Sequence, residues 1–179
     1  MKLDKGTVQR RVDLMAEEGV EFATNTDVGE DARELLEEYD ALVLAIGSTV
    51  PNDLPIPGRE LNGVVFAMEF LTRNQQRLFA SPGALGDVGL TSKYDGSFIS
   101  AEGKHVVVIG GGDTGSDCIG TSLRQGAASV TQIELMPKPP LVRLPENPWP
   151  EWPPVLRTPS SPEEGAERDW SVSTKAFGG

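Results

Sequence analysis

The stretch His105-Val-Val-Val-Ile-Gly-Gly-Gly-Asp-Thr-Gly115 joins a run of β-branched residues to a cluster of glycines. The β-branched run, 106–109, predicts a buried strand, and the residues after the glycines predict a helix over 114–125 that ends at Gly126. A further strand is predicted over 130–135. Strands that alternate with a helix in this way predict an α/β fold with a parallel sheet.

The glycines follow the spacing Gly-x-Gly-x-x-Gly. Gly110 permits a tight turn from strand to helix, Gly112 lacks a Cβ so that a pyrophosphate can approach the backbone, and Gly115 lets the helix pack closely on the strand. The start of the helix adds N–H donors and a partial positive charge for phosphates, and Asp113 or Thr114 is expected to cap it. A glycine-rich loop that binds no ligand also fits the spacing. The flanking strand and helix favour an NAD(P) site, made of Gly110, Gly111, Gly112, Asp113, Thr114 and Gly115.

An acidic residue is expected near the end of the second strand of such a unit, and Glu134 lies there. Its carboxylate can accept hydrogen bonds from the ribose hydroxyls of NADH and would repel the 2′-phosphate of NADPH. Two alternatives remain open. Glu134 is an exposed strand-end residue without a ligand, or Lys138 and Arg143, which lie just beyond it, favour NADPH instead.

The first part of the chain carries a second, weaker half-motif. We expect helices over 7–18 and about 31–38, and strands over 20–24 and 41–46. The apolar run 41–46 ends at Gly47 and suits a strand covered on both faces. Its last residues, Ala45, Ile46 and Gly47, look like the glycine turn that ends a late strand of the FAD domain in flavoproteins with two dinucleotide-binding domains. An ordinary buried strand that ends in glycine is the alternative.

The rest of the chain supplies linkers and surface segments. Three prolines within 51–58 mark a linker, which predicts a boundary between residues 1–58 and 59–179. We expect a strand over 64–66, a helix over 67–80 and a surface excursion over 81–103. Ten of the 14 prolines lie in 137–162, a density that excludes regular helices and central strands there.

Composition limits the classes of function. The net charge of -11 argues against nucleic acid and anionic membranes as partners, and neither apolar run, 41–46 nor 106–109, approaches the ~18 residues of a membrane span. Residues 1–11 contain no apolar stretch typical of a secretion signal. The single cysteine, Cys118, excludes an internal disulfide and a cysteine-held metal cluster, and it fits a reducing compartment.

No side chain is expected to act as a catalytic acid, base or nucleophile, and no metal site is expected. In a dinucleotide enzyme the cofactors carry the chemistry. Cys118 is interpreted as a buried structural thiol rather than a redox group, and His105 as a solvated residue at a strand start. Trp149 and Trp152 lie among prolines and form either an interaction surface or a rigid packed loop.

Several segments together resemble the small (beta) subunit of glutamate synthase and the matching C-terminal region of NADH-dependent single-chain glutamate synthases. The resemblance spans nearly the whole chain. It rests on residues 8–15, 38–41, 110–120 and 135–140, and on Pro55-Ile-Pro-Gly-Arg59, Phe66-Ala-Met-Glu-Phe-Leu71, Asp117-Cys-Ile-Gly-Thr-Ser122 and Asn147-Pro-Trp-Pro-Glu-Trp-Pro153. The fold that it implies is an incomplete set of Rossmann-like domains of the two-dinucleotide-binding-domain flavoprotein type.

The resemblance also implies a role and its cofactors. In that family the small subunit passes a hydride from NADH or NADPH to FAD, and iron–sulfur clusters then carry electrons to FMN in the large subunit or domain. Glutamate forms there from glutamine and 2-oxoglutarate. Residues 1–58 would be the end of the first half of the FAD domain, and 59–179 most of the NAD(P) domain. We expect NADH, with NADPH as the alternative, and FAD in the complete subunit.

Departures from the family pattern keep other functions open. The cysteine-rich region, the first glycine-rich loop for FAD and the final FAD segment have no counterpart, so iron–sulfur clusters are expected outside this chain and the chain is interpreted as an internal fragment. Residues 79–97 look longer than usual. One alternative is a non-catalytic dinucleotide-binding fragment. The other is a related flavin-dependent dehydrogenase subunit, over which residues 147–153 favour glutamate synthase. The expected location is the cytoplasm, or a plastid in a plant or alga.

Overall fold

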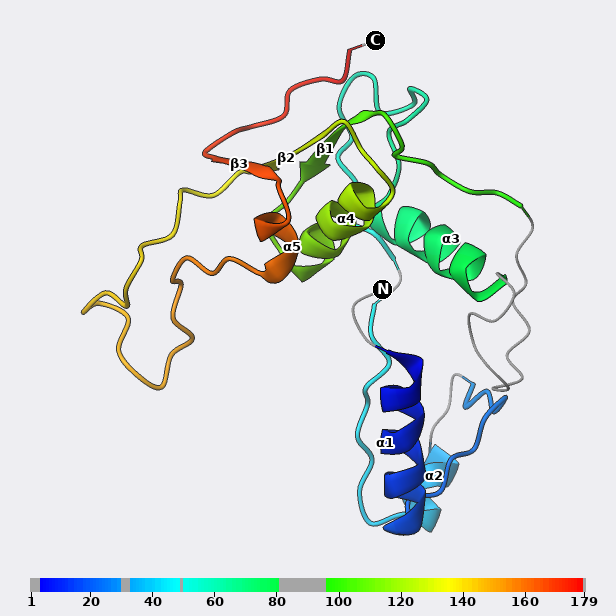
Figure 1. The fold of residues 1–179 in the computed structure, drawn as a ribbon. Coiled ribbons are helices and arrows are strands. Elements are labelled where there is room, and N and C mark those ends of the chain that lie inside the picture. The colour runs from blue at the N-terminus through cyan, green and yellow to red at the C-terminus, as the bar shows by residue number, and fades with distance from the viewer. Residues whose placement is uncertain (1–3, 30–32, 49, 81–95, 179) are drawn as a thin grey trace. The chain divides into compact units, whose positions relative to one another are not determined.

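The computed structural model of the protein describes residues 4–29, 33–48, 50–80 and 96–178 (Figure 1). The chain divides into two compact units, residues 1–50 and 51–179. The division lies between Val50 and Pro51, at the start of the proline-containing segment that the sequence marks as a linker.

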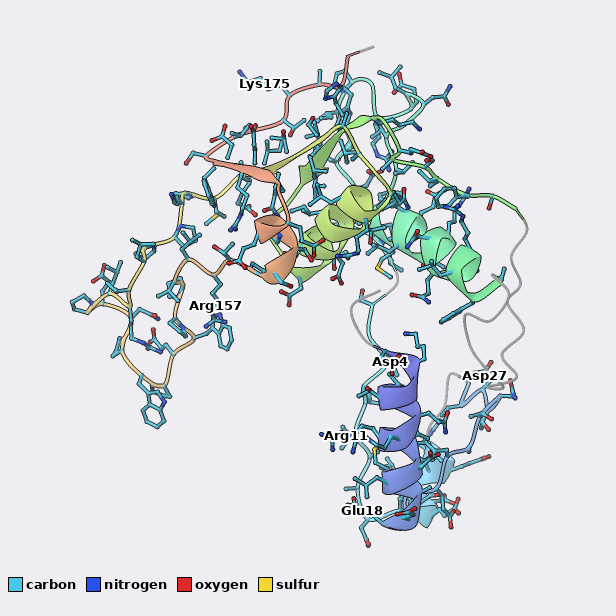
Figure 2. All side chains as sticks on the ribbon, in the orientation of Figure 1. Asp4, Arg11, Glu18, Asp27, Arg157 and Lys175 are labelled. Carbon is cyan, nitrogen blue, oxygen red and sulfur yellow. The ribbon has the colours of Figure 1, made fainter. Side chains whose placement is uncertain are left out.

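The first unit contains two helices. α1 spans Lys5–Glu17, and the carboxylate of Asp4 caps it by accepting a hydrogen bond from the N–H of Thr7 at 3.0 Å (Figure 2). The helix ends before Gly19, whose φ of +96° suits a residue without a side chain. α2 spans Arg33–Glu38. Both helices were predicted, although residues 31 and 32 of the second prediction lie outside the described residues.

The two strands predicted for this unit are wrong. Residues 20–24 and 41–46 form no strand, and Val43 is 85% exposed. An extended segment becomes a strand only when its N–H and C=O groups bond to a neighbouring strand. The described residues of this unit contain no such neighbour, so the apolar run 41–46 stays irregular and uncovered.

The second unit opens with turns rather than with the strand predicted over 64–66. The N–H of Val64 donates to the carbonyl of Leu61 at 3.2 Å, and the carbonyl of Val64 accepts from Nη1 of Arg59 at 3.0 Å. These bonds use the backbone groups that a ladder would need, so that prediction is wrong. The helix that follows, α3, spans Ala67–Ala80 and confirms the prediction.

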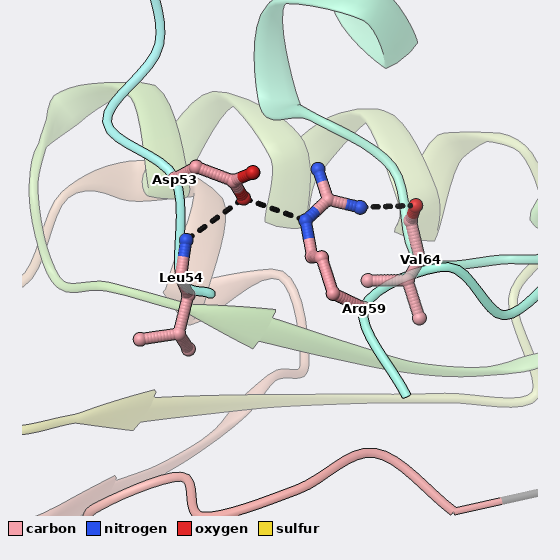
Figure 3. A network of polar contacts seen from close by, with 4 residues as sticks. All are labelled: Asp53, Leu54, Arg59 and Val64. Carbon is pink, nitrogen blue, oxygen red and sulfur yellow. Dashed lines mark hydrogen bonds and ion pairs between the residues drawn. The ribbon is translucent and has the colours of Figure 1, made fainter. Parts of the chain in front are cut away.

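Arg59 is the centre of a polar network that fixes this entry segment (Figure 3). Its Nε donates to Oδ1 of Asp53 at 2.6 Å, and the same oxygen accepts from the N–H of Leu54 at 2.8 Å. The hydrogen bond from Arg59 and then the bond from Leu54 lower the pKa of Asp53. The guanidinium of Arg59 also lies 4.3 Å from the ring centroid of Phe66. These contacts hold together the segment that precedes α3, residues 53–66.

Three strands of the described residues form one parallel sheet in the order β1-β2-β3: β1 spans His105–Ile109, β2 Ser129–Glu134 and β3 Glu167–Trp170. Helix α4, Asp113–Arg124, connects β1 to β2. The predictions of β1, α4 and β2 are confirmed to within one residue. β3 was not predicted.

The core lies between one face of the sheet and helices α3 and α4. It is made of Phe70, Leu71, Ala101, Val108, Cys118, Ile119 and Val130. The residues of β1 alternate between this core and the opposite face, where Val107 is 61% exposed. The expectation that this strand is buried is therefore right for only one of its faces in the described part of the chain.

The proline-rich stretch leaves the sheet after β2 as a long irregular loop (Figure 1). Its irregular course to Pro159 confirms the expectation for that part. Within its last residues a short helix, α5, spans Ser160–Glu163. Pro162 fits there because the N–H groups of a first helical turn have no partner within the helix. The strict exclusion of helix from 137–162 is therefore wrong at its end.

Candidate functional site

The glycine turn lies at the carboxyl edge of the sheet, between Ile109 at the end of β1 and Asp113 at the start of α4. Gly110 has a φ of +114°, a left-handed conformation that suits glycine. Both of its backbone groups are bonded to β2. Its N–H donates to the carbonyl of Ile133 at 2.9 Å, and its carbonyl accepts from Nε2 of Gln132 at 2.8 Å.

Gly112 and Gly115 stand in opposite environments. A Cβ added to Gly112 would have no atom within 4 Å, so the backbone there faces open space. A Cβ added to Gly115 would lie 2.6 Å from the carbonyl oxygen of Gly110. The backbone thus has open space outside Gly112, and α4 packs closely on the turn where Gly115 meets Gly110. A phosphate-binding turn needs both properties.

The start of α4 has no side-chain cap. Its N-cap is Gly112, so Asp113 is already inside the first turn, and no side chain bonds to the cap. The expectation that Asp113 or Thr114 caps the helix is therefore wrong. An uncapped first turn presents backbone N–H groups and the positive end of the helix dipole, and an anion is a suitable partner for both.

Glu134 ends β2 beside this turn. Its Oε2 lies against Gly111, where it would collide with any added Cβ, and its Oε1 accepts from the N–H of Met136 at 3.3 Å. The carboxylate is therefore adjacent to the backbone on which a pyrophosphate would lie. In a dinucleotide the ribose is the next group along, so the carboxylate is in a suitable position for ribose hydroxyls.

Lys138 and Arg143, the two basic residues that would favour NADPH, differ in their surroundings. The ammonium group of Lys138 lies 4.8 Å from the ring centroid of Trp170, the register partner of Glu134, and so stays at the carboxyl edge. Nη1 of Arg143 donates to the carbonyls of Asn147 and of residue 151, at 2.9 and 3.2 Å. Arg143 is therefore used to hold the proline-rich loop, and Lys138 is the stronger candidate for a 2′-phosphate.

Cys118 is buried in α4, as expected. Burial, and next the charge of Asp117, raise the pKa of its thiol to about 11. Because only the thiolate is nucleophilic, this thiol is inert at neutral pH. His105 lies at the opposite end of β1 from the turn, exposed, with Nδ1 2.7 Å from Oγ of Ser129.

The remaining residues singled out in the sequence belong to the first unit or to the proline-rich loop. Ala45, Ile46 and Gly47 belong to the first unit and end no strand, although Gly47 has the left-handed φ of +67° that a glycine turn uses. Trp149 and Trp152 are both strongly exposed, and the guanidinium of Arg157 lies 4.1 Å from the ring centroid of Trp152. Figure 2 labels Arg157 on the proline-rich loop. Of the predicted NAD(P) site, residues 110–112 form the turn, residues 113–115 begin α4, and Glu134 ends β2.

Over the described ranges, no group of three or more His, Cys, Asp and Glu side chains is placed to hold a metal ion. Within the same ranges no helix has the length and apolar character needed to cross a membrane.

Sequence reasoning missed two polar residues at the site. Gln132 is only 2% exposed, and besides its bond to Gly110 it accepts a hydrogen bond from Nε of Arg168 at 3.0 Å. One sign of this role was available in the sequence: Gln132 lies two positions after Val130, and therefore on the same, buried face of β2. Such a residue must find hydrogen-bond partners inside the fold.

A family model described as pyridine nucleotide-disulphide oxidoreductase matches residues 4–146 of the chain. This match covers the glycine turn, α4, β2 and residues 4–50 of the first unit.

Curated relatives extend the similarity over almost the whole chain. The glutamate synthase [NADH] of Schizosaccharomyces pombe is 49% identical over 187 aligned residues, which cover 99% of this chain and 8% of that protein. The glutamate synthase [NADPH] small chains of Mycobacterium tuberculosis and Bacillus subtilis are 49% and 42% identical, over 99% and 97% of this chain. This chain spans 36% and 35% of those two proteins, about a third of their length.

Proposed function

Because the chain belongs to the pyridine nucleotide-disulphide oxidoreductase family, we propose that it is the nicotinamide-binding part of a glutamate synthase small subunit or of the equivalent region of a single-chain enzyme. In this proposal the chain binds NADH or NADPH and presents it for hydride transfer to FAD. The complete enzyme uses those electrons to make glutamate from glutamine and 2-oxoglutarate. Residues 59–179 are assigned to the nicotinamide domain and 1–58 to part of the FAD domain.

The observation that carries the proposal is the contrast between Gly112 and Gly115. Open space outside Gly112 lets phosphate oxygens reach the uncapped first turn of α4, and the tight approach at Gly115 holds that turn against Gly110. A turn of this kind at the carboxyl edge of a parallel sheet is suited to a dinucleotide pyrophosphate. Gly110, Gly111, Asp113 and Thr114 complete the proposed contact.

The proposal includes a preference for NADH, which rests on Glu134. Its carboxylate lies beside Gly111, where it suits ribose hydroxyls and opposes a 2′-phosphate. The names of the relatives do not decide this point, since one is an NADH enzyme and the others are NADPH enzymes at similar identity. Lys138, held over the ring of Trp170, is the residue that would favour NADPH.

FAD, when bound in the complete subunit, supplies the acceptor for the hydride. Ala45, Ile46 and Gly47 are the proposed contribution of this chain to the FAD side. A Cβ on Gly47 would meet no atom within 4 Å, so a cofactor has room to approach its backbone. The role of this chain is to bind and orient the nicotinamide dinucleotide, and no side chain is assigned a proton transfer.

The proposed partner is the large subunit or domain of glutamate synthase, and iron–sulfur clusters are proposed to lie outside this chain. Nucleic acid and membranes are not proposed partners, because the net charge is -11. A cytoplasmic location is proposed from the single cysteine, with a plastid as the alternative in a plant or alga.

The proposal is tested by adding NADH anaerobically to the intact protein that contains this chain. Bleaching of the flavin absorbance at a rate that saturates with NADH concentration is the expected result. Intact protein with bound flavin that neither NADH nor NADPH reduces would contradict it, and would favour a dinucleotide-binding role without catalysis.

A further inference from the structure

The side chain of Gln132 is a buried polar group beneath the start of α4. An amide in such a place is stable only when its donor and acceptor both have partners. Here Nε2 donates to the carbonyl of Gly110 at 2.8 Å and Oε1 accepts from Nε of Arg168 at 3.0 Å. Gln132 therefore links the glycine turn to β3.

Arg168 fixes the orientation of this amide. It is the register partner of Gln132 in the parallel pair of β2 and β3, so the two side chains lie next to each other. Its Nη1 also donates to the carbonyl of Arg157 at 3.3 Å, and its guanidinium lies 5.1 Å from the ring centroid of Trp170. Because arginine is only a donor, it takes the amide oxygen and leaves the NH₂ group to face Gly110.

The carbonyl of Gly110 controls the next N–H group of the turn. A peptide unit is planar and trans, so the C=O of Gly110 and the N–H of Gly111 point in opposite directions. When Gln132 holds that carbonyl towards β2, the N–H of Gly111 points away from the core. The N–H of Gly110 is held separately by the carbonyl of Ile133 at 2.9 Å.

We propose that Gln132, held by Arg168, is a positioning residue for the nicotinamide dinucleotide: it sets the peptide between Gly110 and Gly111 so that the N–H of Gly111 faces the pyrophosphate. This inference rests on the proposed function of the glycine turn. The bond from the N–H of Gly110 to the carbonyl of Ile133 joins two backbone groups and depends on no side chain, whereas the bond from Gln132 to the carbonyl of Gly110 depends on the Gln132 side chain. Without it, the peptide is free to rotate and must be ordered when the phosphate binds.

The test compares Gln132→Met with Gln125→Met in the intact protein. Gln125 is a matched control at the other end of α4. Its Oε1 accepts from the N–H of Ala101 at 2.7 Å, and its Nε2 donates to Oδ1 of Asn74 at 3.0 Å. Both substitutions remove two internal hydrogen bonds and keep the side-chain length, so both should lower the melting temperature. Calorimetric titration with NAD⁺ and NADP⁺ should give a dissociation constant about tenfold weaker for Gln132→Met only.

Steady-state kinetics separates positioning from a merely structural role. A loss of folded protein lowers kcat, whereas the proposed role of Gln132 raises KM for the dinucleotide and leaves kcat unchanged. Should Gln132→Met fail to fold, Gln132→Glu keeps the partner of Arg168, removes the donor to Gly110, and should show the same rise in KM.

Two results would overturn the inference and are distinguishable. Wild-type protein that binds neither NAD⁺ nor NADP⁺ would contradict the proposed function and this inference together. Wild-type binding with an unchanged affinity and KM in the Gln132 variants would contradict the inference alone.

Discussion

Replacing Gly112 with alanine separates binding from folding at the glycine turn. The backbone of Gly112 has φ −77° and ψ 179°, an extended conformation that alanine adopts without strain, and an added Cβ would meet nothing within 4 Å. Reduced freedom of the unfolded chain should stabilise the variant by about 0.4–1 kcal/mol, and loss of a glycine N-cap should offset most of this. The free energy of unfolding should therefore change by less than about 0.5 kcal/mol.

The same methyl group should weaken dinucleotide binding substantially. It enters the open space through which phosphate oxygens would reach the first turn of α4. Hydrogen bonds to a charged group contribute about 1.5–3 kcal/mol each, so losing one raises the dissociation constant about tenfold or more. Calorimetric titration of the intact protein with NAD⁺ and NADP⁺, beside thermal unfolding, measures both quantities.

Gly178→Ala is the control for Gly112→Ala, because Gly178 also has open space around an added Cβ and lies outside the turn. It should leave affinity unchanged and should raise the free energy of unfolding by no more than about 1 kcal/mol. An unchanged affinity of Gly112→Ala for both dinucleotides would refute the reasoning. So would a large loss of stability, which would show that the space outside Gly112 is filled by the protein itself.

Three further substitutions or measurements test other parts of the account. Glu134→Gln removes the carboxylate that opposes a 2′-phosphate, so the ratio of NADPH to NADH affinity should rise about tenfold, and an unchanged ratio in titrations would be inconsistent with its role. Gly115→Ala places a Cβ 2.6 Å from the carbonyl oxygen of Gly110 and should lower the free energy of unfolding in urea by about 1–3 kcal/mol. The three atoms nearest to a Cβ added at Gly120, in the same helix, all belong to side chains, so Gly120→Ala should cost less. Equal losses would show that the backbone contact at Gly115 is unimportant. Burial raises the pKa of Cys118 from 9.0 to about 11, so the free energy of unfolding should fall as the pH rises from 9 to 11, where the unfolded thiol ionises and the folded one does not. Replacement of this cysteine by alanine should remove that part of the pH dependence, and rapid alkylation of the native thiol at about pH 8 would contradict its burial.

The part of the fold that the sequence predicts well is held by local signals. The β-branched residues of β1, the glycines after them and the apolar spacing of α4 each act over a few residues. Glycine positions also identify the turn, because Gly110 needs a left-handed φ and Gly115 needs close packing, and both requirements belong to the chain itself.

The errors concern strands, which depend on neighbours distant in the sequence. The apolar run 41–46 is strand-like in composition, yet the described residues of its unit offer no partner, and it remains irregular. β3 is the opposite case: it is a strand that was not predicted, because its sequence Glu-Arg-Asp-Trp has no apolar run. It is a strand since Glu167 to Trp170 pair with Thr131 to Glu134 of β2.

The polar support of the site was missed for the same reason. Gln132 is a buried hydrogen-bonding residue only because the fold brings Gly110 and Arg168 to its two ends, from 22 and 36 positions away in the sequence. The place of Glu134 beside the turn could be predicted because its distance from the glycines along the chain is itself a signal.

The central claim is that the glycine turn at the carboxyl edge of the sheet binds a nicotinamide dinucleotide. Hydrogen–deuterium exchange of the intact protein, with and without NAD⁺ or NADP⁺, tests it most directly because it reports on the backbone N–H groups themselves. We expect slower exchange in residues 110–116 and no change at the far end of α4. Binding of a dinucleotide that slows exchange elsewhere and leaves residues 110–116 unchanged would contradict it.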